Sequence, residues 1–400
     1  MAIDSPLDSP LESLSHRDTL ESSKRATMAL EVREHGFEAA HARFGEQWHK
    51  LLKRGGLNIS LAPEFVRAAA ASVGLLDKVR VLAAHCGSEL VGVMPFVPTA
   101  TKMFAIPMKV LSLAGNLVSY HHELVAPDCQ TELLRACLRD PKRSWHVLQM
   151  DNVPVDGPTG QALRRLAHEE RFALVAYSGD VAPYLPIAQS WDQFLASKSG
   201  NFRSNLKRKE KSLLKGGTLG ERWFHSVEDV AELYRCMQAI ESKSWKSTAE
   251  VAVTAEGNEG IYYKELLPFL AGRGLLFANV LYLTGEPVAY HLCYFHEGQV
   301  GNMKTSFDEA RQSFSPGAVV IQRAIEKAFE AGAHEFDFLG DDQYHKRLWT
   351  DSARAHQTYF LFSRDLRARA IGHVKAVLQA RRKADFRAVI RRSEALEPDH

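Results

Sequence analysis

Apolar residues recur along the chain with two periods, one typical of helices and one typical of strands. Steps of three and four residues predict helices in the following segments: 37–53, 63–74, 130–139, 159–170, 191–197, 227–243, 261–272 and 316–332. Alternating or continuous apolar runs predict strands in these segments: 79–86, 90–97, 146–150, 172–178, 275–283, 287–296, 299–307, 335–339 and 356–362. Glycine-containing turns at 87–89, 285–286 and 297–298 indicate hairpins between neighbouring strands.

The order of these elements is the same in both halves of the chain: helices, a hairpin, a helix and a strand. We therefore expect an α/β (α+β) protein with two domains of similar design, at 31–185 and 186–363, each a mixed, mostly antiparallel sheet flanked by helices. Residues 1–30 are rich in Ser, Pro, Asp and Glu, which predicts a disordered tail. Residues 364–400 should form a basic amphipathic helix and tail.

The helix expected at 316–332 has the clearest terminal signals. Ser315 suits the N-cap, Pro316 suits the first helical position, and Gly332 suits the C-cap. The small residues Gly317 and Ala318 leave the N–H groups of the first turn open to an anion such as a phosphate. A capped helix that binds nothing is the alternative for these residues taken alone.

Composition narrows the class of protein. The chain has 400 residues, of which 45% are hydrophobic and 24% charged, with a net charge of +2, so it is no general polyanion binder and DNA is not expected as a partner. Five scattered cysteines lack the spacing of a metal site and fit a reducing compartment. Neither an apolar run of about 18 residues nor a secretion signal is present, which predicts a cytoplasmic protein. Positive charge is local, at 201–215 and 364–392.

The second half contains three expected antiparallel strands, a helix that begins at a glycine turn and a final strand. Within this order lie the segments Glu241–Lys246, Pro287–Tyr290, Ser315–Gly317, Asp337–Asp341 and Tyr344–Lys346, followed by Trp349. This set resembles the GNAT (GCN5-related) N-acetyltransferases. It looks more closely like their CelD/BcsL branch, linked to cellulose and exopolysaccharide synthesis and akin to Fem-type aminoacyltransferases. This resemblance implies tandem GNAT-like domains with a degenerate first domain, acyl-CoA as co-substrate and no permanently bound cofactor. The phosphate loop, Ser313–Gly317, is shorter than in typical members.

Acyl transfer from a thioester to an amine needs a neutral amine, a polarised carbonyl and a proton for the departing thiolate. We expect catalytic roles for polar residues on or just after the strands of the second half: Asp337, Tyr344, His291 and Lys346. The coenzyme would be bound by Ser315, Gly317, Ala318 and Lys304. The acceptor would be bound by Trp245, Lys243, Arg203, Asp341 and Trp349. No metal is expected.

Each catalytic candidate has a structural alternative. Asp337 lies between two phenylalanines and could form an ion pair with a neighbouring element. Tyr344 and Lys346 could belong to a solvated short helix, and His291 could be a hydrogen-bonded interior residue. Lys304 could face either a phosphate or solvent.

The leading hypothesis is an acyl-CoA-dependent N-acyltransferase. Its acceptor would be an amine on an envelope polysaccharide or lipid precursor, for example a sphingoid-type long-chain amine, and the basic segments would contact anionic membrane at its inner face. A Fem-type transferase that uses aminoacyl-tRNA is the second hypothesis. Those enzymes carry a long coiled-coil insertion, whereas 200–270 is interrupted by glycines, so tRNA is disfavoured. The third hypothesis is a non-catalytic scaffold of a polysaccharide or lipid synthesis system.

Overall fold

The computed structural model describes residues 30–114, 122–140, 144–249 and 251–394, with the backbone alone described at 381–394. Except for Leu30, the predicted disordered tail lies outside the described residues. Within them, strands form a 12-stranded sheet in the order β1-β2-β3-β4-β5-β12-β6-β11-β10-β9-β8-β7. The strands are β1 (Leu30–Gly36), β2 (Arg80–Cys86), β3 (Glu89–Met103), β4 (Ile106–Leu113), β5 (Val147–Pro154), β6 (Ala173–Pro186), β7 (Leu219–Phe224), β8 (Leu276–Leu283), β9 (Glu286–His296), β10 (Gln299–Phe307), β11 (Glu335–Asp337) and β12 (Ala353–Phe362).

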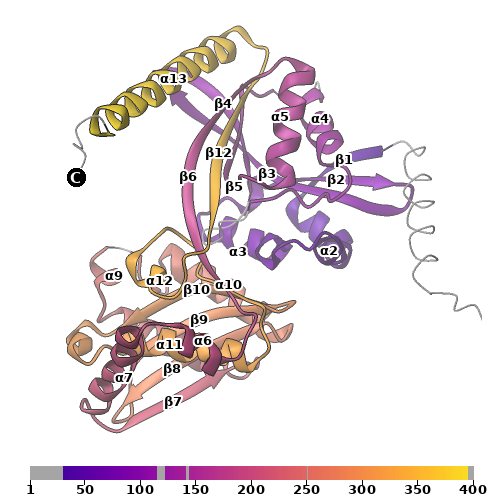
Figure 1. Cartoon of the computed structure of the whole chain (residues 1–400). Coiled ribbons are helices and arrows are strands. Elements are labelled where there is room, and N and C mark those ends of the chain that lie inside the picture. The colour runs from indigo at the N-terminus through magenta and orange to yellow at the C-terminus, as the bar shows by residue number, and fades with distance from the viewer. Residues whose placement is uncertain (1–29, 115–121, 141–143, 250, 395–400) are drawn as a thin grey trace, which may run out of the picture.

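Helices cover this sheet in both halves (Figure 1). The helices of the first half are α2 (Phe37–Arg54), α3 (Pro63–Ser72), α4 (Gln130–Arg139) and α5 (Pro158–Glu170). Those of the second half are α6 (Trp191–Ser197), α7 (Gly200–Leu214), α8 (Val230–Glu241), α9 (Trp245–Thr248), α10 (Asn258–Gly272), α11 (Pro316–Glu330) and α12 (Tyr344–Arg347). The last helix, α13 (Leu366–Glu394), packs on β6 and β12 at the far end of the first half. The predicted mixed, mostly antiparallel sheet flanked by helices is confirmed.

Two long strands connect the halves. β6 pairs with β12 from residue 173 to 183 and with β11 from 184 to 186, so a single strand belongs to the sheets of both halves. β12 lies between β5 and β6, although its place in the sequence had suggested a strand of the second half. Figure 1 shows β6 and β12 side by side from the first half to the second.

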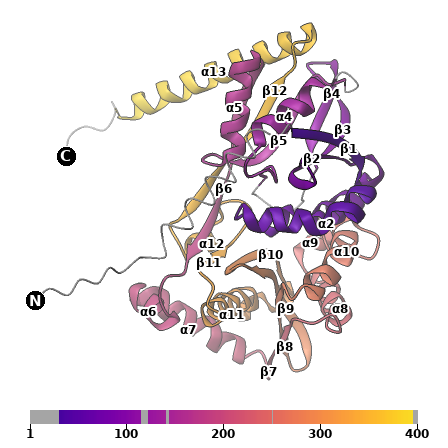
Figure 2. The same cartoon turned by 90° about the vertical axis from the view of Figure 1, so that its right-hand side faces the viewer.

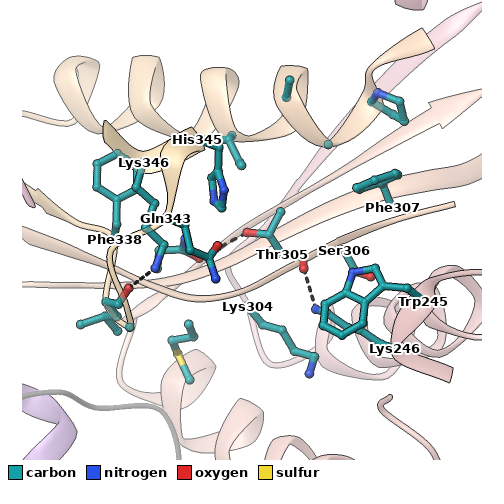
Figure 3. A pocket seen from close by; sticks show the side chains of 18 of the residues that line it. Trp245, Lys246, Lys304, Thr305, Ser306, Phe307, Phe338, Gln343, His345 and Lys346 are labelled. Carbon is teal, nitrogen blue, oxygen red and sulfur yellow. Dashed lines mark hydrogen bonds between the residues drawn. The ribbon is translucent and has the colours of Figure 1, made fainter. Parts of the chain in front are cut away.

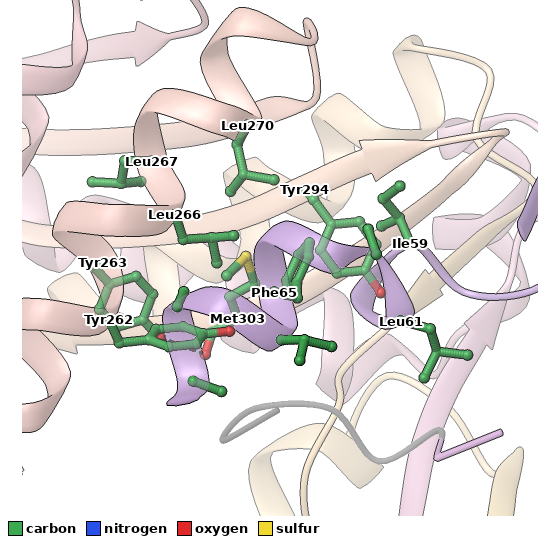
Figure 4. Packing of buried hydrophobic residues seen from close by; sticks show 14 of the residues in the cluster. Ile59, Leu61, Phe65, Tyr262, Tyr263, Leu266, Leu267, Leu270, Tyr294 and Met303 are labelled. Atoms are coloured by element: carbon green, nitrogen blue, oxygen red, sulfur yellow. Dashed lines mark hydrogen bonds between the residues drawn. The ribbon is translucent and has the colours of Figure 1, made fainter. Parts of the chain in front are cut away.

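A shared hydrophobic core also joins the halves. Phe65 of α3 packs edge-on against Tyr294 of β9, with ring centroids 6.1 Å apart. Around this pair, α3 packs on α10, and buried apolar side chains from both helices form one cluster (Figure 4). In the view of Figure 2 the first half lies directly above α8, α9 and α10. The position of α10 relative to the sheet of the second half is therefore fixed in part by the first half.

Most helices and strands begin and end within a few residues of their predicted limits, and the differences have local causes. β1, β7 and α9 were not predicted, because each is a short segment with few apolar residues. Ser315 does stand at the N-cap of α11, but its φ of 59° places it in the left-handed region and its side chain accepts no capping hydrogen bond. On α13, Ala368 and Ile371 are buried, whereas Leu366 faces solvent.

Candidate functional site

β10 and β11 diverge after a short parallel contact. Gln299 to Gly301 pair with Glu335 to Asp337, and there β11 ends while β10 continues to Phe307. A bulge between Asn302 and Lys304 interrupts the pairing of β10 with β9. Bulges bend a strand and increase its twist, so β10 turns away from the β11 side here. The diverging strands leave one edge of β10 open.

A cavity of about 760 Å³ lies along this open edge. Its walls come from β10, the start of α11, the 338–346 segment, α9, the start of α10 and Lys209 of α7. Figure 3 shows Trp245 and Lys246 at one end, His345, Gln343 and Lys346 at the other, and Lys304 and Thr305 between them. Of the residues proposed from sequence, the cavity wall includes Trp245, Lys304, Ser315, Gly317, Ala318 and Lys346.

The N-terminus of α11 forms one wall of the cavity. Pro316 has no N–H, and the N–H groups of Ala318 and Val319 donate to the carbonyl of Ser315 at 3.1 and 3.2 Å. Within the described part of the chain, the Gly317 N–H is therefore the first-turn donor that remains for an anion. A Cβ on residue 317 would lie 2.6 Å from Cδ1 of Phe307, so glycine is required where the helix meets β10.

Positive charge lines the same region. Lys209 of α7 faces the cavity, and burial, followed by the nearby Arg208, lowers the pKa of its ammonium group. The Ser212 hydroxyl donates to the carbonyl of Ser313 at 3.2 Å, which ties α7 to the turn before α11. A lysine and a helix N-terminus thus line the same cavity, which suits a phosphate or diphosphate.

Lys346 closes the opposite end of the cavity. Its Nζ donates to the carbonyls of Leu339 and Asp341 at 2.6 and 2.9 Å. These contacts hold the turn after β11, in which Leu339 and Gly340 have φ angles of 44° and 70°. Burial lowers the pKa of Lys346, opposed by the neighbouring Asp341. In the structure the Lys346 side chain therefore fixes the shape of the turn after β11.

An ionic cluster of Glu241, Lys246, Lys304 and Glu259 lies next to the Trp245 end of the cavity. The carboxylate of Glu241 is fully buried and accepts hydrogen bonds from the Tyr290 hydroxyl at 2.5 Å, Lys246 Nζ at 3.2 Å and the Val253 N–H at 2.6 Å. Three donors compensate this buried charge.

Two lysines connect this carboxylate to the cavity. Lys304 Nζ lies 2.9 Å from Glu259 Oε2 and 3.7 Å from Glu241 Oε1. Lys246 Nζ also donates to the carbonyl of Thr305 at 2.6 Å. Burial first, and the charge of Lys304 second, lower the pKa of Lys246 to about 8.

His291 lies behind the cavity wall and does not line the cavity. It is fully buried, stacks on Phe336 at 6.0 Å, and its Nδ1 is 2.7 Å from the Thr305 hydroxyl, which does line the cavity. Burial, followed by repulsion from His345, lowers the pKa of His291 to about 3. His291 is therefore a neutral imidazole that orients Thr305.

Two of the proposed catalytic residues point elsewhere. Asp337 is fully buried, where its Oδ1 accepts the Leu339 N–H at 2.8 Å and its Oδ2 lies 3.2 Å from Arg354 Nη1. This is the structural ion pair that was the alternative for this residue. Tyr344 is 81% exposed and lies outside the cavity wall.

Four proposed acceptor-binding residues also lie outside the cavity wall. Arg203 donates to carbonyls at the C-terminus of α6, and Trp349 packs on Phe202 with ring centroids 5.2 Å apart. Lys243 is exposed, with Nζ 4.0 Å from Asp308, and Asp341 is exposed near Lys346.

Glu241, Glu259 and Thr305 were not singled out from the sequence. Each lies on a different element, α8, α10 and β10, and they meet only because these elements pack together. The available signal was weak: Glu241 and Lys246 lie in the segment that carried the resemblance, but the sequence alone did not identify them as a pair.

Comparisons with known proteins agree with this geometry. Residues 200–347 match the family model described as an acetyltransferase (GNAT) domain. No curated protein sequence matches the chain. A solved structure described as the C-terminal domain of a lysylphosphatidylglycerol synthetase from Agrobacterium fabrum has a TM-score of 0.50 and 10% identity, over 84% of this chain and 96% of that chain.

Two further solved structures are similar over comparable lengths. FemX gives a TM-score of 0.47 and 13% identity, over 74% of this chain and 90% of that chain. A tandem GNAT protein from the clavulanic acid biosynthesis pathway gives a TM-score of 0.45 and 10% identity, over 83% of this chain and 98% of that chain. At such low identity, solved structures inform the fold alone.

The matched segment contains the diverging strands, the start of α11 and every residue of the cavity wall. The second half thus contains a GNAT acetyltransferase domain, which supports an N-acyltransferase, as the sequence had indicated. The narrower CelD/BcsL resemblance stays a prediction.

Proposed function

We propose that the cavity binds an acyl-CoA thioester and transfers its acyl group to a primary amine. The observation that carries this proposal is the position of the cavity, along the open edge of β10 and against the N-terminus of α11. A diphosphate at the Gly317 N–H and Lys209 would direct the rest of an extended donor along β10.

The open edge of β10 supplies the polar groups that the reaction needs. As an amine adds to a thioester carbonyl, negative charge develops on the oxygen, and backbone N–H groups along an unpaired strand edge can stabilise it. Asn302, Met303 and Lys304, at the bulge, line the cavity and would supply such groups. No covalent enzyme intermediate is required, because the amine attacks the thioester directly.

The acceptor we propose is an amine carried by an envelope polysaccharide or lipid precursor. The wall of the cavity near Trp245 combines an exposed indole with the carboxylate of Glu259, which suits an amine borne on a sugar or an alkyl chain. Beside the cavity, the outer face of α7 exposes Arg203, Lys207, Arg208 and Lys211, which suits an acceptor held at an anionic membrane. None of the described helices is long and apolar enough to cross a bilayer.

Calorimetry tests the donor site directly. Coenzyme A should bind the full-length protein, whereas pantetheine, which lacks the diphosphate, should bind at least about 10-fold more weakly because it cannot use the helix N-terminus. Equal affinity for both would contradict the proposed diphosphate site. Release of free thiol from acetyl-, octanoyl- and palmitoyl-CoA, with glucosamine or octylamine as acceptor, then tests the transfer and the acyl length. If coenzyme A gives no heat, the scaffold hypothesis is favoured.

The exposed basic face of α7 also supports the second candidate, an aminoacyl-tRNA donor. A tRNA would contact this face through its phosphates, so its affinity would fall steeply with salt. Arg208→Ala together with Lys211→Ala should weaken tRNA binding and leave coenzyme A affinity unchanged. Ribonuclease-sensitive transfer to an amine would establish this donor, and ribonuclease-resistant transfer from acyl-CoA would exclude it as the sole donor.

A further inference from the structure

The groups of the ionic cluster are hydrogen-bonded to one another, and Lys246 is one of those that also reach the cavity. Lys246 Nζ donates to Glu241 Oε1 at 3.2 Å and to the Thr305 carbonyl at 2.6 Å. An amine nitrogen has four tetrahedral positions, of which one is the bond to its own side chain and two are taken by these acceptors. The Lys246 side chain keeps 11% of its surface exposed, and that surface belongs to the cavity wall.

Lys304, the other lysine of this cluster, has more acceptors around its Nζ: Glu259 at 2.9 Å, the Val251 carbonyl at 3.2 Å and Glu241 at 3.7 Å. Lys346 lies at the other end of the cavity, where two carbonyls of its own turn hold its Nζ. In a neutral Lys246, both hydrogens would be held by the two acceptors, and the lone pair would occupy the position that faces the cavity.

We propose that the corner formed by Lys246, Glu259 and Trp245 is the binding site for the acceptor's protonated primary amine, and that Lys246 accepts its proton. This inference rests on the proposed function. The exposed indole of Trp245 and the partly exposed carboxylate of Glu259 attract an ammonium group, while the lone pair of Lys246 removes one of its hydrogens. Glu241 does not act as the base, because its carboxylate stays hydrogen-bonded to its three donors throughout the reaction.

The protons balance as follows. The acceptor R–NH3+ gives one proton to the neutral Lys246, which becomes an ammonium, and the resulting R–NH2 adds to the thioester carbon. The C–N bond forms, the C–S bond breaks, and the second proton on nitrogen passes to the departing thiolate. Lys246 then releases its proton to solvent. The sum is one ammonium and one thioester converted to one amide, one thiol and one proton.

The surroundings of Lys246 bias it toward the neutral form. Burial lowers the pKa of Lys246 most, and repulsion by the Lys304 ammonium of β10 lowers it further. Glu241 of α8 and Glu259 of α10 raise the pKa, but they do not cancel the lowering. Tyr290 of β9 is hydrogen-bonded to Glu241, and the pKa of its phenol is raised far above the ordinary value by burial, so it stays neutral. Lys246 is accordingly able to exchange a proton near pH 8.

Competitive acetylation measures this property without any need for the natural acceptor. Short pulses of acetic anhydride between pH 6 and 10 modify only neutral amines, and peptide mass spectrometry quantifies each lysine in the wild-type protein. Lys246 should be modified with a midpoint near pH 8. Lys264, exposed on α10 and outside the cavity, is the internal control for access of the reagent. Hexylammonium should slow modification of Lys246 and leave Lys264 unchanged.

A Lys246 midpoint at the ordinary lysine value of about 10.4, or no protection of Lys246 by hexylammonium, would overturn the proposal. Lys246→Arg supplies a second measurement, since arginine keeps the charge and both hydrogen bonds but cannot accept a proton. Its affinity for coenzyme A should be unchanged, while the rate of acyl transfer should fall by about 100-fold or more and lose its rise near pH 8. Lys264→Met should behave as wild type. If coenzyme A fails to bind the wild type, the proposed function fails instead, and acetylation still reports on Lys246.

Discussion

Replacing Asp337 separates a structural role from a catalytic one. The Asp337 carboxylate is fully buried, and its hydrogen bonds include those from the Leu339 N–H at 2.8 Å and from Arg354 at 3.2 Å. Each hydrogen bond to a charged group contributes about 1.5–3 kcal/mol, and Arg354 keeps Glu335 as a second partner when Asp337 is replaced. Asp337→Ala removes both of these hydrogen bonds and should therefore lower the free energy of unfolding by about 3–5 kcal/mol.

Asp337→Asn is the more informative variant, because it keeps an oxygen for the Leu339 N–H and loses only the charge that faces Arg354. It should cost about 1.5–3 kcal/mol, an amount that a protein with about 5–15 kcal/mol of stability survives. Asp341→Asn is the matched control: it is exposed in the following turn and should change stability by less than about 0.5 kcal/mol.

Urea denaturation and thiol release from acetyl-CoA should be measured on the same preparations. We expect Asp337→Asn to shift the urea midpoint and to leave the rate of acyl transfer within a few-fold of wild type, since Asp337 lies outside the cavity wall. The reasoning would be refuted if the transfer rate fell by about 100-fold or more while the urea midpoint stayed unchanged. That result would return Asp337 to the catalytic role that the sequence suggested.

Three further predictions concern the walls of the cavity. Gly317→Ala should weaken coenzyme A binding in calorimetry and cost about 1–3 kcal/mol of stability in denaturation, because its Cβ would lie 2.6 Å from Phe307. Gly272→Ala is the control: its Cβ would meet nothing within 4 Å, so both measurements should match the wild type. The pKa of His291 is lowered to about 3, so the unfolded chain gains a proton below about 6.5, and stability should fall by about 2 kcal/mol from this group between pH 6.5 and 4.5. His291→Asn should remove that part of the acid sensitivity in denaturation at the two pH values. Lys346→Met removes the donor to the buried Leu339 carbonyl and the half-buried Asp341 carbonyl, so urea denaturation should show a loss of about 1–3 kcal/mol. The affinity for acetyl-CoA should also be weaker, because the turn loosens.

Local periodicity was sufficient to predict much of the fold. α4 and α6 begin and end at the predicted residues, and β8, β9 and β10 lie within one residue of theirs. Each of these segments contains its own signal, either apolar spacing or a glycine turn at its end. The place of β12 between β5 and β6 could not be predicted in this way, because strand order depends on contacts between residues far apart in the sequence.

Those parts of the candidate site that lie within a single segment of the sequence could be predicted. Ser315, Gly317 and Ala318 were proposed from the start of a helix, and all three line the cavity. Side-chain direction was not predictable: Asp337 and Tyr344 follow one another closely, yet one is buried in an ion pair and the other faces solvent. The cluster around Glu241 was missed because its members come from separate elements.

The first half of the chain contributes to the cavity through α10. Tyr263 lines the cavity and also belongs to the hydrophobic cluster that contains Phe65 of α3. Glu259 lies one turn earlier on the same helix, so the packing of α3 on α10 fixes the position of the carboxylate that we assign to the acceptor. β12, in turn, forms its hydrogen bonds with β5 and β6. We infer that the two halves act as one unit, in which the first half holds the acceptor wall at a fixed distance from the open edge of β10.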